Sequence, residues 1–76
     1  MIKIDKALLD VAILHVHEAV ETTIKYYSNA SEKTAIDCSV DSALYPLGKY
    51  IDIREEEEIR KLLTVEAIKA YKQYIK

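Results

Sequence analysis

The chain has 76 residues, of which half are hydrophobic and about a third charged, and its formal net charge is −2. This length fits one small helical domain over residues 1–76, and a chain so short buries only about 60% of its unfolded surface, so its stability is marginal. One cysteine excludes an intramolecular disulfide, and two histidines are too few for the usual structural zinc sites. The acidic balance argues against a general nucleic-acid binder, which carries a basic face.

The N-terminal residues lack the pattern of an export signal, a basic region followed by an uninterrupted apolar run. Asp5, Asp10, His15 and Glu18 interrupt the apolar residues too often for a membrane span. The free thiol of Cys38 fits a reducing compartment. We therefore expect a soluble, cytoplasmic protein with no membrane partner.

Residues 6–27 are predicted to form a long amphipathic helix. Apolar residues recur there at three- and four-residue steps, without Gly or Pro, which places them on one face of a helix. Asp5 is expected to cap this helix because its carboxylate can accept hydrogen bonds from the first backbone N–H groups. The predicted apolar face consists of Leu9, Ala12, Ile13, Val16, Ala19, Val20, Thr23, Ile24 and Tyr27.

The N-terminal half of this helix is apolar well beyond one face. Within residues 7–16 only two side chains are polar, and Leu8, Val11 and Leu14 lie off the main face. A helix that is apolar nearly all round is usually buried on more than one side, and a domain of this size has few elements to cover it. The pattern predicts an interface with a protein partner or, by two-fold pairing of this helix, with a second copy of the chain.

Residues 31–48 fit either a helix or one arm of a hairpin. The helix would be capped by Ser31, and its apolar face would consist of Ile36, Val40, Ala43, Leu44 and Leu47. The hairpin would pair the alternating residues Ile36, Cys38 and Val40 with Ile51 and Ile53. The five-residue helical face outlasts the three-residue alternation, so the helix is favoured. Pro46 and Gly48 end either element.

Asp52 is predicted to cap a C-terminal helix, with Glu55 three residues later in the capping-box position. The apolar face that begins with Ile59 should continue at position 66, where the sequence has Glu66. The face then resumes out of phase as Val65, Ile68, Tyr71, Tyr74 and Ile75. This shift predicts a kink or a split, with Thr64 capping a second helix.

Together these elements predict an all-α fold, a small helical bundle with a long N-terminal helix and a kinked or split C-terminal helix pair. Short connections would make neighbouring helices antiparallel. The alternative is an α+β fold with a hairpin at about residues 35–54 between two helices.

Residue types that carry chemistry are few. His17 and Glu21 lie one helical turn apart and could share a metal ion, although two ligands do not make a site. His15 is expected to be partly buried, with its hydrogen bond satisfied. Cys38 has no adjacent base that would activate it as a nucleophile. We therefore expect no enzymatic activity and no cofactor.

The chain has six tyrosines but no Trp or Phe. Tyrosine combines an apolar ring with a polar tip, which suits core edges and interfaces. Tyr71 and Tyr74 alternate with lysines near the end of the chain and are candidate interface residues. Stacking of these tyrosines on nucleic acid is the less favoured alternative.

Residues 55–76, EEEEIRKLLTVEAIKAYKQYIK, resemble the last third of acyl carrier proteins, where an acidic short helix leads to a final helix capped by Thr-Val. Asp41-Ser42 followed by Leu44 is similar to the Asp-Ser-Leu that holds the phosphopantetheine arm in that family. The resemblance implies a carrier protein modified on Ser42. In that family the serine opens a long helix, whereas Pro46 follows Ser42 closely here.

The sequence favours a non-enzymatic protein-interaction or regulatory module that forms a small homo-oligomer or binds a larger protein. A carrier modified on Ser42 is the second hypothesis. A small metal-linked or nucleic-acid-linked binding protein is the third.

Overall fold

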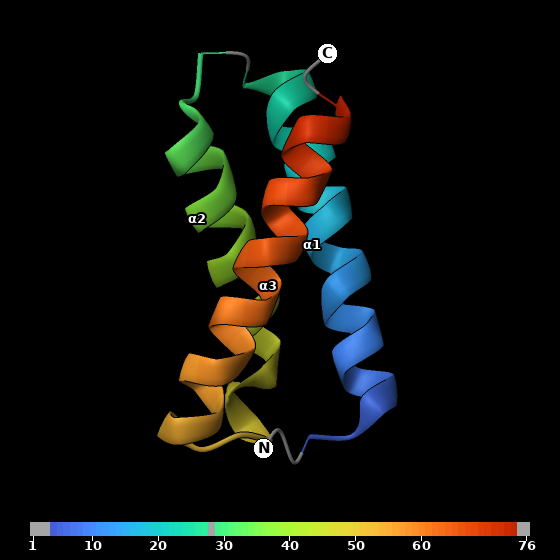
Figure 1. Ribbon diagram of the computed structural model, residues 1–76, viewed down its shortest axis with the longest axis vertical. Helices are drawn as coiled ribbons and strands as arrows, with labels where there is room; N and C mark the ends of the chain where they lie inside the picture. The colour runs from blue at the N-terminus through green and yellow to red at the C-terminus, as the bar shows by residue number, and fades with distance from the viewer. Residues whose placement is uncertain (1–3, 28, 75–76) are drawn as a thin grey trace.

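Three α-helices and one short 3-10 helix make up the computed structural model, which describes residues 4–27 and 29–74 (Figure 1). The elements are α1 (Lys6–Tyr26), α2 (Glu32–Leu44), η1 (Tyr45–Lys49) and α3 (Ile53–Tyr74). No strand occurs in these described ranges, so the all-α prediction is confirmed and the alternative hairpin at about 35–54 is wrong.

The three α-helices pack side by side, and each contacts the other two. α2 returns antiparallel to α1, and α3 then runs beside both in the direction of α1 (Figure 1). α1 has 21 residues and α3 has 22, and at about 1.5 Å per residue each helix is roughly 32 Å long. They therefore span nearly the whole length of a body that measures 35 × 18 × 17 Å.

The three predicted helix starts are confirmed. The carboxylate of Asp5 accepts a hydrogen bond from the backbone N–H of Ala7 at 2.8 Å. The Ser31 hydroxyl accepts one from the N–H of Thr34 at 3.1 Å, and Asp52 accepts one from the N–H three residues later at 2.8 Å. Each bond satisfies one of the N–H groups that the first turn of a helix leaves without an intrahelical partner.

Small and branched aliphatic side chains build the core, because the chain has no Phe or Trp. Val16 and Val20 of α1, Val40 of α2, and Ile59 and Leu63 of α3 are almost completely buried. Alanines on all three helices fill the spaces between these larger residues, so the helix backbones can approach closely. These buried alanines are Ala12, Ala35, Ala43, Ala67 and Ala70.

The sequence predicts a kink or a split at Thr64. α3 is a single helix through this residue, so the split is wrong. The Thr64 hydroxyl donates to the carbonyl of Arg60, four residues earlier, at 2.7 Å. This is the bond that a threonine makes inside a helix, whereas a capping threonine accepts from an N–H group that follows it. Thr64 is thus an interior residue of α3.

The apolar face of α3 keeps its phase because alanines complete it. It runs from Leu63 to Ala67 and Ala70, all of which are fully buried. The sequence prediction followed only large apolar residues and so shifted the face onto Val65, which is 52% exposed. Ile75, the last residue of that predicted face, lies outside the described residues.

η1 connects α2 to the linker before α3. Pro46 lies in its first turn, where the missing N–H costs nothing and the fixed φ suits a helix. Leu47 is buried and packs with the core. η1 is thereby held against the end of the bundle at which α1 begins (Figure 1).

Candidate interaction surface

An apolar groove lies where the N-terminal half of α1 meets the end of α2 and η1. Its volume is about 430 Å³. Ala12, Ala43 and Leu47 form its floor, since these three lining residues are buried. Two of them are alanines, whose short side chains leave the space open. The other lining residues are Leu8, Val11, His15, Tyr45, Pro46, Lys49 and Tyr50.

Large apolar side chains surround the groove and are exposed. Val11 is 63% exposed, Tyr45 88% and Tyr50 60%. Leu14, 59% exposed, lies one turn after Val11 on the outer side of α1. We call these four side chains the apolar patch. Exposed apolar side chains that gather in one region of a protein surface often mark an interaction site.

Only part of the predicted interface lies in this region. Val11 and Leu14 belong to the apolar patch, and Leu8 lines the groove but is half-buried and packs against the core. Tyr71 also packs against the core, and Tyr74 is 38% exposed in the last turn of α3. The end of α3 lies at the opposite end of the bundle from η1 (Figure 1), so these two tyrosines do not join the patch.

His15 links α1 to α2 at the wall of the groove. Its Nε2 and the hydroxyl of Ser42 share a hydrogen bond of 3.1 Å. The histidine is half-buried, so the expectation of a satisfied, partly buried His15 is confirmed.

Ser42 and His15 combine a hydroxyl with a base, but their position does not suit acyl transfer. Ser42 lies in the last turn of α2, where the helix presents backbone carbonyl groups. A nucleophilic serine needs N–H donors nearby to stabilise the oxyanion. The acyl carrier resemblance likewise implies a serine that opens a helix, whereas Ser42 lies near the end of one.

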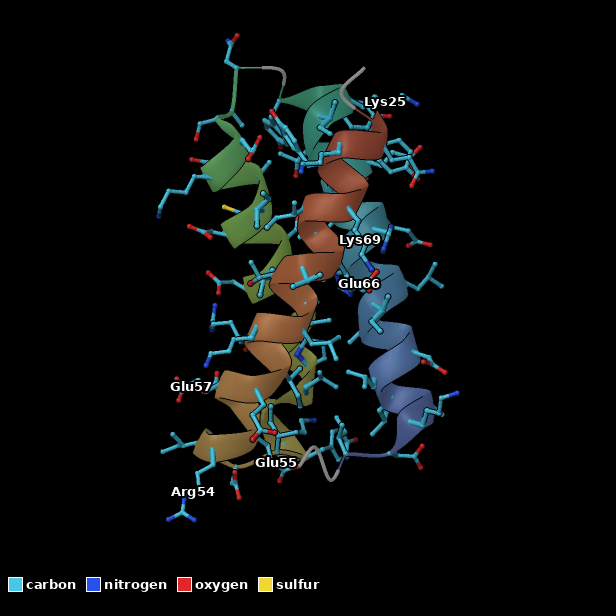
Figure 2. The ribbon with its side chains drawn as sticks, in the orientation of Figure 1. Lys25, Arg54, Glu55, Glu57, Glu66 and Lys69 are labelled. Atoms are coloured by element: carbon cyan, nitrogen blue, oxygen red, sulfur yellow. The ribbon has the colours of Figure 1, made fainter. Side chains whose placement is uncertain are left out.

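A polar contact joins α1 to α3 at mid-height of the bundle. Nε2 of His17 lies 3.0 Å from Oε1 of Glu66, and the two side chains are 28% and 23% exposed. Nζ of Lys69 lies 3.5 Å from the other carboxylate oxygen, and Figure 2 shows Lys69 and Glu66 side by side on α3. The hydrogen bond from His17, followed by Lys69, lowers the pKa of Glu66 below its usual value, although desolvation opposes this.

In the sequence, Glu66 interrupts an apolar face, and the spacing of His17 and Glu21 predicts that these two side chains lie together. The structure places His17 against Glu66, while Glu21 is exposed on α1. One signal was available: an acid on the apolar side of one helix and a histidine at the flank of another can satisfy each other across an interface. No group of three metal-binding side chains occurs in residues 4–27 and 29–74.

The described helices include none that is long and apolar enough to span a membrane. Comparison of the chain with protein-family models, curated proteins and solved structures finds no match.

Proposed function

We propose that this protein is a non-enzymatic protein-interaction module that binds its partner through the groove and the apolar patch. The observation that supports the proposal is the open apolar groove with Val11, Tyr45 and Tyr50 exposed at its edge. Removing apolar surface from water contributes about 25 cal/mol per Å². Covering these side chains with a partner is thus favourable.

The polar groups around the groove also suit a protein partner. His15, Lys49 and the hydroxyl groups of Tyr45 and Tyr50 can donate hydrogen bonds around an apolar floor. None of the ten lining residues is an acid, although the chain has 13 acidic residues. An apolar centre with a polar rim is the usual anatomy of a protein interface. The donors favour a partner that brings apolar side chains together with an acidic group.

Site-specific photo-crosslinking in cells that express the chain tests the proposal. Tyr50 is replaced by benzoylphenylalanine, which preserves an aromatic ring at the edge of the groove. Val65, exposed on α3, receives the same residue as the control position. We expect a discrete covalent adduct from position 50, absent from position 65 and lost when Val11→Lys is added.

The mass of the adduct identifies the partner. An adduct of twice the chain mass is a second copy, and any other mass is a different protein, whose purified form must then bind the wild-type chain but not Val11→Lys. The absence of an adduct at position 50, or equal adducts at both positions, would overturn the proposal.

A further inference from the structure

We infer that the partner is a second copy of this chain, with the two α1 helices packed antiparallel about a two-fold axis. This inference rests on the proposed function and names its partner. A two-fold contact uses the same surface on both copies, so it requires a surface that is complementary to itself.

The exposed apolar residues of α1 meet that requirement. In an antiparallel pair centred between residues 12 and 13, Val11 of each copy faces Leu14 of the other. One contact then covers the two side chains that are 63% and 59% exposed in the single chain. Ala7 lies on the same side of α1, one turn earlier, and its small side chain lets the two helices approach.

Charge complementarity supports the same arrangement. The pairing places Glu18 of the second copy opposite Ala7, near the start of α1. Lys49 is the last residue of η1 and lines the groove together with Leu8, the residue that follows Ala7.

Lys49 and Glu18 are both exposed, and neither makes an ion pair within the described ranges of the single chain. Two-fold symmetry forms the contact between them twice. The second copy also supplies the acidic group that the donors around the groove favour.

The area that a dimer needs is available. A stable interface covers about 800 Å² on each partner, roughly a seventh of the 5467 Å² surface of this chain. Self-association also adds stability to a chain whose core is small.

Sedimentation equilibrium tests whether the dimer forms. We expect the average mass of the wild-type chain to rise from monomer toward dimer between about 1 μM and about 1 mM. The double variant Val11→Lys/Leu14→Lys should remain folded by circular dichroism and raise the dissociation constant about a hundredfold or more, because four apolar side chains leave the interface. Val65→Lys makes the same change at an exposed position of α3 and should leave the equilibrium unchanged.

A charge swap tests the antiparallel arrangement. Lys49→Glu and Glu18→Lys should each weaken self-association about tenfold. Either substitution places like charges at positions 49 and 18, so both symmetry-related contacts become repulsive. A mixture of the two variants restores attraction at both contacts, so it should form a heterodimer about as tight as the wild type. High salt should reduce the difference between the mixture and the single variants.

Two results would overturn the inference: a wild-type chain that stays monomeric over this range, or a mixture that recovers no affinity. The proposed function has a separate outcome. If the chain is monomeric but still crosslinks to a different protein through position 50, the proposed function stands with another partner. If no adduct forms, both the proposed function and the inference of a dimer are overturned.

Discussion

Glu66 lies at a position where an amphipathic helix would carry an apolar side chain. Its contact with His17 reduces the free-energy cost of placing a carboxylate there. Burying a carboxylate without a partner is costly, but Glu66 has both the histidine at 3.0 Å and Lys69 at 3.5 Å. The contact stabilises the ionised carboxylate of Glu66. Because it connects α1 to α3, it also stabilises one particular register of the two helices.

The lowered pKa of Glu66 predicts a specific loss of stability in acid. A carboxyl group whose folded-state pKa lies below its unfolded value stabilises the fold when ionised. That contribution is fully present above the ordinary value of 4.5 and disappears as the pH falls through the lower folded value. We therefore expect urea unfolding to show a larger loss of stability for the wild type than for Glu66→Gln between about pH 6 and pH 3.

Glu21→Gln provides the control for this measurement, since Glu21 is an exposed acid on α1. As the pH is lowered, the stability of this variant should decrease in parallel with that of the wild type. If Glu66→Gln also follows the wild-type curve, the contact between His17 and Glu66 contributes nothing to the acid sensitivity of the fold.

Individual capping residues could be predicted from the sequence, whereas the contact between His17 and Glu66 could not. Asp5, Ser31 and Asp52 each act on N–H groups two or three residues away, so local sequence contains both partners. His17 and Glu66 are 49 residues apart. Their contact depends on which sides of α1 and α3 face each other, which the sequence pattern leaves open.

Among the helices, α3 shows why small residues are easily misinterpreted. Alanine has a high helix propensity but only a small apolar side chain. The predicted apolar face of this helix therefore does not include Ala67 and Ala70. The helix–helix contact needs them there, since they are fully buried. The helical character of α2 was easier to predict, because four positions of the five-residue apolar face lie within it and the fifth, Leu47, lies in η1.

Thr64→Ala should raise the melting temperature slightly. Thr64 lies inside α3 and donates to the carbonyl four residues earlier, so the change removes no cap and introduces a better helix former. We expect a gain of about 0.5 kcal/mol in the free energy of unfolding, measured by thermal and urea denaturation. A loss of about 1 kcal/mol would instead indicate that the hydroxyl caps a second helix, as the sequence pattern had indicated.

At the scale of the whole molecule, the core and the groove differ in how far the sequence reveals them. The core follows from periodic apolar residues on three helices. The groove is formed by α1 residues 8–15 and by residues 43–50, segments that are distant in sequence. Its shape depends on where alanines of α1 and α2 meet, and only the assembled bundle shows that.

Val16→Asp should unfold the protein, and Val11→Asp should not. Val16 is completely buried and Val11 is 63% exposed, on the same helix. An unpaired buried carboxylate costs several kcal/mol, a large part of the roughly 5 kcal/mol that stabilises a small domain. Circular dichroism at neutral pH should therefore show loss of helix for Val16→Asp alone. Two variants with equal helix content would mean that α1 does not face the core through Val16.

Cys38 gives the molecule a built-in attachment point for spectroscopy. It is the single cysteine of the sequence, it is exposed on α2, and it does not line the groove. A nitroxide attached there would be one spin per chain, without any engineered substitution. Pulsed electron resonance on the labelled protein would then report one narrow distance for a two-fold pair, whereas isolated chains would show no dipolar coupling at all.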